Sequence, residues 1–182
     1  MAIEIEKKYR LTAKQRDEVV SRLKQLRAKS KPLEFEVNTL YAGESLDLSR
    51  CVLRLRRVGN QSILTYKERF PSRSDIKHQR EDETRVDNAE GMELILDALG
   101  FHPALVYEKR RQRWYVGDSE IAIDELPFGL FMEIEGDEAG IRETESQLAI
   151  KRLRVEEETY PQLTRKHGKM IDGIITSRFS RP

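Results

Sequence analysis

Several short segments of this chain alternate apolar with charged residues, and this pattern constrains the fold more than any other feature. Residues 2–10 read AIEIEKKYR and residues 51–58 read CVLRLRRV. Successive side chains of a β-strand point to opposite faces, so each segment is expected to form a strand with one apolar and one charged face. A chain with many such strands must cover the apolar faces, and helices are the available cover.

The same reasoning along the whole chain predicts a mostly antiparallel sheet. Strands are expected at residues 2–10, 33–42, 51–58, 62–68, 77–86, 104–116, 120–126 and 130–135. Helices are expected near residues 12–29, between Asp87 and Gly100, near 137–150 and, as one short helix, after residue 151, with a loop at 69–76. Capping-box pairs open the first two helices, Thr12 with Gln15 and Asp87 with Glu90. We therefore expect an α+β fold, an eight-stranded antiparallel β-barrel (tunnel) with helices packed outside.

Composition limits the partners and the compartment. The chain has 33 basic and 32 acidic residues among 182, a formal net charge of +1, which argues against nucleic acid bound through a generally basic surface. Its single cysteine, Cys51, cannot form an intramolecular disulfide, and no apolar run approaches the ~20 residues that span a membrane. Residues 1–10 also lack the apolar core of a signal peptide. We expect a cytoplasmic protein without membrane association; a homodimer is left open.

The charged strand faces differ in sign along the chain. Acidic residues concentrate on the first and last strands, at Glu4, Glu6, Asp124, Glu133 and Glu135. Basic residues concentrate mainly on the strands between, at Lys8, Arg54, Arg56, Lys67, Arg80, Arg85, Lys109, Arg111 and Arg113. For any single strand, a face turned to water is the simpler interpretation. Solvated faces usually mix the two signs, however, so the separation favours a shared interior.

Charges that line one cavity need partners, because isolated buried ions are very unfavourable. Carboxylate oxygens suit hard Mg²⁺ or Mn²⁺, whereas arginine and lysine side chains suit phosphate oxygens. A divalent cation also bridges to phosphate. The pattern therefore predicts a site for a metal ion and a polyphosphate.

Short motifs along the expected strands resemble those of a known family. In order they are 4–8 (EIEKK), 52–56 (VLRLR), 64–67 (LTYK), 80–83 (REDE), 109–111 (KRR), 123–125 (IDE), 131–135 (FMEIE) and 159–160 (TY) with Leu163. This ordered set resembles the ExExK, LRLR, LTxK and KxR strands, the final acidic hairpin and the closing segment of the CYTH superfamily, the triphosphate tunnel metalloenzymes. The resemblance covers about residues 2–165, so we expect one domain over 1–182 with a basic C-terminal tail at about 166–182.

The resemblance implies a role for each matching residue in an eight-stranded tunnel. Metal ligands would be Glu4, Glu6, Glu133 and Glu135, with Asp124 joining them or orienting metal-bound water. The triphosphate would be clamped by Lys8, Arg54, Arg56, Lys67, Lys109 and Arg111, with Arg80 as a further clamp. The expected catalytic residues are Glu6, Lys8 and Asp124; Lys8 acts as a base only if its pKa is depressed, and otherwise as a phosphate clamp. The roles of Glu81 and Glu83 are not assigned.

Two segments depart from the family pattern. Glu68, Arg69 and Phe70 replace the small, glycine-bearing segment that usually follows the LTxK lysine, and residues 128–130 read FGL where many relatives have GLG. Both segments lie at strand ends. They therefore bear on the choice of substrate more than on the fold.

The resemblance leaves three functions open. The first is a Mg²⁺- or Mn²⁺-dependent triphosphatase acting on thiamine triphosphate, inorganic triphosphate or a nucleoside triphosphate. The second is a class IV adenylyl cyclase, which makes cyclic AMP and pyrophosphate from ATP and which residues 99–129 also resemble. The third is a module that binds a polyphosphate without catalysis.

Overall fold

A computed structural model of the chain describes residues 2–70 and 75–180. Of the predicted loop at 69–76, residues 71–74 lie outside the described residues, and Arg69 belongs to the preceding strand. Within the described ranges, no helix is long and apolar enough to cross a membrane.

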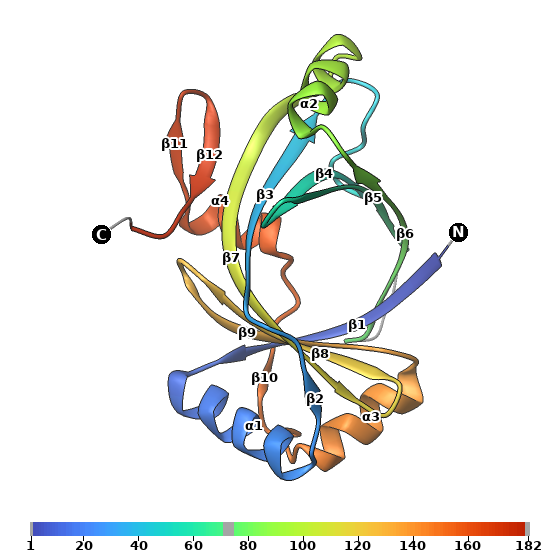
Figure 1. The fold of residues 1–182 in the computed structure, drawn as a ribbon, viewed down its shortest axis with the longest axis vertical. Helices are drawn as coiled ribbons and strands as arrows, with labels where there is room; N and C mark the ends of the chain where they lie inside the picture. The colour runs from blue at the N-terminus through green and yellow to red at the C-terminus, as the bar shows by residue number, and fades with distance from the viewer. Residues whose placement is uncertain (1, 71–74, 181–182) are drawn as a thin grey trace.

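Eight strands close into an antiparallel barrel, which confirms the predicted α+β fold. They are β1 (Ala2–Leu11), β3 (Glu34–Ala42), β4 (Cys51–Val58), β5 (Gln61–Arg69), β6 (Lys77–Val86), β7 (His102–Val116), β8 (Ser119–Leu126) and β9 (Gly129–Glu135). Their order around the barrel is β7-β3-β4-β5-β6-β1-β9-β8, and β8 pairs again with β7 to close it. Figure 1 shows β1, β6, β5, β4 and β3 as successive parts of this ring. Closure leaves the barrel with an outer and an inner face and without a free edge.

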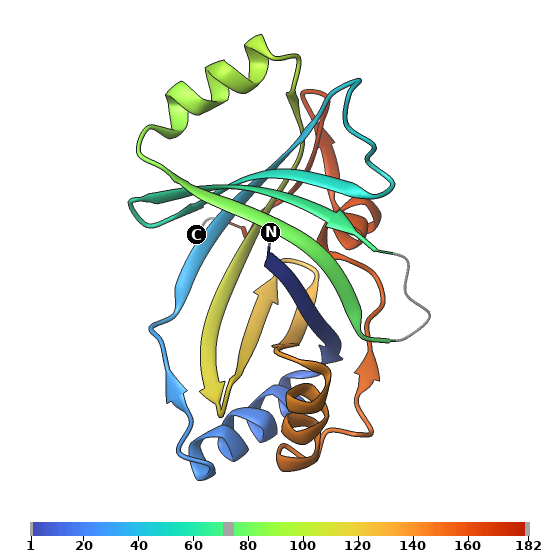
Figure 2. The same cartoon turned by 90° about the vertical axis from the view of Figure 1, so that its right-hand side faces the viewer.

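The outer face carries most of the hydrophobic core. Helices α1 (Ala13–Gln25) and α3 (Glu138–Gln147) lie together against β1, β8 and β9 (Figures 1 and 2). Leu23 of α1 and Ile141 of α3 are completely buried there against Ile121 and Ile134. Because strand side chains alternate, this apolar packing turns Glu4, Glu6 and Lys8 of β1 and their counterparts on β9 toward the interior.

The other two helices cover different parts of the barrel. Helix α2 (Ala89–Ala98) buries Leu96 against Tyr41 and Leu55 at the upper end in Figure 1. Helix α4 (Tyr160–His167) packs Tyr160 and Leu163 against inward-facing side chains of β3, β7 and β9. Helix α4 therefore covers one end of the barrel interior.

Two predicted helix boundaries were wrong. The first helix ends at Gln25 rather than near residue 29, because Arg27 adopts a positive φ of 56° and Lys29–Ser30 form a short strand, β2, that pairs with β7. The N-cap of α2 is Asn88, whose side chain accepts a hydrogen bond from the Gly91 amide, rather than Asp87. Asparagine and aspartate are nearly equivalent N-caps, so adjacent candidates are not separable by residue type.

The C-terminal part contains more structure than the single short helix that was expected. Besides α4 it forms β10 (Arg154–Val155), β11 (Lys169–Ile171) and β12 (Ile174–Ser177). Asp172 and Gly173, both with positive φ, connect β11 to β12. An Asp-Gly pair between apolar residues is a strong hairpin signal that the sequence interpretation passed over. The hairpin extends the sheet because β12 pairs in parallel with the first half of β7.

Replacing Thr12 with alanine is expected to lower the free energy of unfolding by about 1 kcal/mol. Thr12 and Gln15 form a reciprocal capping box at the start of α1, and alanine removes the side-chain acceptor for the Gln15 amide. Urea denaturation measures the change. Ser21→Ala, at an exposed position within the same helix, is the control and should not destabilise the protein; equal losses in both variants would contradict the assigned cap.

Candidate functional site

The barrel encloses a cavity of about 270 Å³ that is lined mainly by charged side chains. Its basic lining residues are Lys8, Arg54, Arg56, Lys67, Arg69, Lys109, Arg111 and Arg113. Its acidic lining residues are Glu4, Glu6, Glu81, Glu83, Glu120, Glu133 and Glu135. Residues far apart in the sequence thus converge because they occupy the inward positions of strands that close on one another.

Most of the residues predicted for the site line this cavity. They are the four glutamates expected to bind metal (Glu4, Glu6, Glu133 and Glu135) and six of the seven expected clamps (Lys8, Arg54, Arg56, Lys67, Lys109 and Arg111). The sheet register brings opposite charges face to face: Lys8 lies opposite Glu133 across β1 and β9. The interior is therefore a mixed field of charges rather than a purely basic groove.

Arg80 does not lie in the cavity, which corrects its placement as a phosphate clamp. Its guanidinium bonds to Asp82 at 2.6 Å and lies over the Tyr66 ring, with 37% of the side chain exposed. The inward positions of β6 are Gln79, Glu81 and Glu83. Neighbours in a strand point to opposite faces, so an inward Glu81 places Arg80 outside.

Asp124 lies behind the cavity wall and is completely buried. Its two carboxylate oxygens accept hydrogen bonds from Arg111 at 2.7 and 2.6 Å, and the Tyr160 hydroxyl donates a third at 2.6 Å. The Lys109 ammonium lies 3.5 Å away. Arg111 also pairs with Glu133. In this arrangement Asp124 anchors two cavity cations and the first turn of α4, instead of presenting a free carboxylate to a ligand.

Sequence reasoning missed several residues that belong to the site. Arg69 and Glu120 line the cavity, and Glu36 is completely buried beside Lys109, 3.3 Å from its ammonium. Burial would raise the pKa of Glu36, but Lys109 and the nearby arginines outweigh it and lower that pKa. The signal that could have found Arg69 is its two-residue spacing from Lys67 in the same strand.

Lys8 is held as a charged ammonium. Its Nζ lies 3.2 Å from Glu133 Oε1 and 3.9 Å from the centre of the Tyr160 ring. Burial by itself lowers the pKa of Lys8, but the carboxylates of Glu133 and Glu6 outweigh burial and raise it. A lysine with a raised pKa suits the binding of phosphate better than the removal of a proton.

Arg54 and Arg56 of β4 share one acidic partner. Both guanidinium groups approach Glu83 Oε1, at 3.3 and 3.2 Å. Burial and the neighbouring Arg54 charge lower the pKa of Arg56. Arg54 also lies 3.8 Å from Glu81. The two guanidinium groups still have more donors than these carboxylates engage, which leaves capacity for an anionic ligand.

Carboxyl groups crowd together where β1, β6 and β9 meet. Lys67 donates to both Glu4 and Glu81, at 2.6 and 2.8 Å. Burial and the contact with Glu4 raise the pKa of Glu81 to about 8. For Glu4, burial has the same tendency, but the contacts with Glu81 and Lys67 outweigh it and lower the pKa to about 2. Burial and the charges of Glu4 and Glu120 raise the pKa of Glu135 to about 7. Such crowding marks a place where a cation would relieve repulsion.

The donor chemistry suits Mg²⁺ or Mn²⁺, since the acidic side chains offer only oxygen ligands. Within residues 2–70 and 75–180, however, no three acidic, histidine or cysteine side chains converge as a ready metal site. Several of the carboxylates are instead paired with lysine or arginine. Metal binding at Glu4, Glu6, Glu133 and Glu135 would therefore require them to exchange these basic partners for the ion.

Comparisons with known proteins agree with this architecture. The PH1012 protein from Pyrococcus horikoshii shares 25% sequence identity, with a TM-score of 0.74 over 88% of this chain and 98% of that one. A candidate adenylate cyclase from Vibrio parahaemolyticus is 20% identical, with a TM-score of 0.70 over 90% of this chain and 98% of that one. HpAC1, a candidate adenylyl cyclase from Hippeastrum described as having a dominant triphosphatase activity, is 16% identical, with a TM-score of 0.69 over 96% of this chain and all of that one.

Among curated proteins, no sequence matches this chain. The sequence model of the CYTH domain matches residues 2–166, which include all eight barrel strands and most of α4. The chain therefore belongs to the CYTH family.

Proposed function

We propose that this chain binds a triphosphate inside the barrel and hydrolyses a phosphoanhydride bond with the help of Mg²⁺ or Mn²⁺. The observation that carries the proposal is the convergence of eight basic and seven acidic side chains on one small cavity. A polyphosphate and a divalent cation together would satisfy both sets of charges. The triphosphatase activity described for HpAC1 is consistent with this assignment.

Ligand binding in this proposal is an exchange of ion-pair partners. Phosphate oxygens replace Glu83 as the partner of Arg54 and Arg56, and they approach Lys8 and Lys67 from the cavity side. Arg111 stays anchored by Asp124 while its remaining donors turn to the ligand. The buried guanidinium and ammonium groups hold the phosphate chain in one orientation, which lowers the entropic part of the barrier.

The metal ion would be held by Glu4, Glu6 and Glu135, with Glu133 released from its basic partners. When bound there, a divalent cation supplies charge neutralisation and Lewis-acid polarisation of the phosphate. Lys8 and Lys109 are almost fully buried, so their charges act more strongly than they would in water.

One assay separates the candidate activities. The protein is incubated with ATP, thiamine triphosphate and inorganic triphosphate, each with Mg²⁺ or Mn²⁺, while phosphate, pyrophosphate and cyclic AMP are measured separately. Release of phosphate without cyclic AMP supports hydrolysis. Binding without turnover would replace the proposal with a polyphosphate-binding module.

An adenylyl cyclase is the second candidate, favoured by one feature of the cavity. Leu40, Val52 and Tyr107 contribute an apolar part to the lining near Tyr160 of α4, where a purine ring could pack. The Vibrio parahaemolyticus neighbour is described as a candidate adenylate cyclase. Pyrophosphate and cyclic AMP in equal amounts from ATP would establish this activity.

Arg56→Ala is expected to weaken triphosphate binding by roughly 10- to 100-fold, the loss typical for a hydrogen bond to a charged group. The matched control is Arg57→Ala, because Arg57 follows Arg56 in β4 but pairs with Glu93 of α2 at 2.9 Å outside the cavity. Calorimetric titration with inorganic triphosphate measures both variants. Equal affinities for the two would remove Arg56 from the proposed clamp.

A further inference from the structure

Arg69 is the last residue of β5. Lys67 and Arg69 are two positions apart, so both point into the barrel, with Cα atoms roughly 6.6 Å apart along the strand. Arg69 thus adds a guanidinium group to the cavity lining.

Arg69 differs from the other cavity cations in lacking an acidic partner. Within the described parts of the chain, seven of the eight basic side chains lining the cavity form an ion pair with a carboxylate, and Arg69 is the exception. Its side chain donates to Thr159 Oγ1 at 3.2 Å. Glu6 acts on it only at longer range, and Arg165 adds a second positive charge nearby. Arg69 is therefore the cavity cation that no carboxylate of the described residues meets at ion-pair distance.

The position of Arg69 limits what can lie beside it. Thr159, Tyr160 and Pro161, at the start of α4, line the same cavity. Tyr160 and Leu163 pack against Leu40, Tyr107 and Phe131 and so obstruct this end of the barrel. A group that reaches Arg69 must therefore be small as well as negatively charged.

We propose that Arg69 and Thr159 form the subsite for the terminal phosphate of the bound triphosphate. The ligand then binds with its free phosphate end toward α4. This inference rests on the proposed binding of a triphosphate, and it opposes the arrangement in which a purine packs beside Tyr160 of α4. A terminal phosphate carries more negative charge than an esterified one, and the guanidinium fork can bind two of its oxygens. The organic group, where the substrate has one, then extends away from α4.

The test uses ATP as a probe, because its three phosphates give separate ³¹P resonances. Binding is measured by calorimetry and by ³¹P NMR without metal, and again with Ca²⁺. Arg69→Gln is expected to weaken ATP and inorganic triphosphate binding by roughly 10- to 100-fold. The γ-phosphate resonance of bound ATP should change most between the wild-type and variant proteins, and the α-phosphate resonance least.

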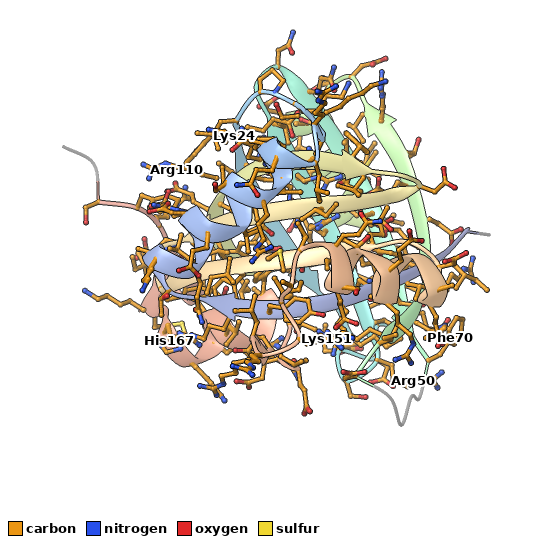
Figure 3. The ribbon with its side chains drawn as sticks, turned by 90° about the horizontal axis from the view of Figure 1, so that it is seen from below. Lys24, Arg50, Phe70, Arg110, Lys151 and His167 are labelled. Atoms are coloured by element: carbon orange, nitrogen blue, oxygen red, sulfur yellow. The ribbon has the colours of Figure 1, made fainter. Side chains whose placement is uncertain are left out.

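The matched control is Arg50→Gln. Arg50 lies next to the same strand end, at the edge where Figure 3 labels Arg50 and Phe70, but it pairs with Glu68 at 2.9 Å and has a half-exposed side chain. This variant should bind both ligands like the wild-type protein. Arg69→Met provides a second neutral variant if Arg69→Gln does not fold, and Arg69→Lys should recover part of the affinity.

Several results would overturn the subsite. One is an unchanged affinity for ATP and inorganic triphosphate in Arg69→Gln or Arg69→Met. Another is a change in the ³¹P spectrum centred on the α-phosphate resonance, which would place the nucleoside end beside α4. Failure of the wild-type protein to bind either ligand would overturn both this inference and the proposed function. Binding with the expected γ-phosphate change but without turnover would refute only the hydrolysis.

Discussion

Replacing Glu6 with glutamine is expected to lower metal-dependent turnover at least about 100-fold, because even indirect supports of a metal ion commonly contribute 10- to 100-fold. Glu6 is buried and lies opposite Glu135 where β1 meets β9. Glutamine has nearly the same shape but lacks the charge that a divalent cation requires. Among the residues that the structure describes, the nearest basic group is the ammonium of Lys77 at 3.7 Å, so the fold there does not depend on a tight ion pair at this position.

The Glu6→Gln experiment needs three measurements. Phosphate release is followed over a range of Mg²⁺ and Mn²⁺ concentrations, metal affinity is measured by calorimetry, and folding is followed by thermal denaturation. Glu125→Gln is the control, since Glu125 lies on β8 with an exposed side chain paired to Arg110 outside the barrel; Figure 3 shows Arg110 at the periphery of the molecule. Full activity in Glu6→Gln would refute the proposed metal site.

Replacing Asp124 with alanine is expected to lower the free energy of unfolding by about 3–5 kcal/mol, the usual effect of breaking a buried ion pair. The variant leaves Arg111 and Lys109 buried with one fewer carboxylate, and it leaves the Tyr160 hydroxyl without its acceptor. Glu133 still pairs with Arg111, so some neutralisation remains. Urea denaturation measures the free energy of unfolding of this variant and of a control, Glu125→Ala, which removes an exposed acid from the next position. The difference between the two losses is the effect of the buried position.

The same variant separates an anchor from a catalytic group. Inorganic triphosphate should stabilise Asp124→Ala more than it stabilises the wild-type protein if the ligand replaces the missing negative charge and therefore binds more tightly. If Asp124 is instead a direct metal ligand, its removal should lower turnover and metal affinity with little effect on stability. The second result would return Asp124 to the catalytic and metal-binding roles that its sequence position suggests.

Local alternation of residues was sufficient to predict the barrel strands but not to decide which face each strand turns inward. In β6, alternation separates Arg80 and Asp82 from Glu81 and Glu83, yet either pair is charged enough to suit an interior site. Only the closed sheet, with Lys67 opposite Glu81, determines that Arg80 lies outside. A period of two shows which residues share a face of the strand but not which face turns into the barrel, so a neighbouring strand is needed to decide it.

The sequence by itself determined the eight barrel strands, the helices that cover their apolar faces, and the separation of acidic and basic residues, since these follow from spacing and residue type within a few positions. The tertiary structure alone decided that Asp124 is sealed behind Arg111, that Glu36 belongs to the site, and that Arg69 has no acidic partner among residues 2–70 and 75–180. Those properties depend on which distant strands meet when β8 closes on β7 and where α4 packs. Burial and ion pairing arise between segments that are remote in the chain, so local sequence patterns do not specify them.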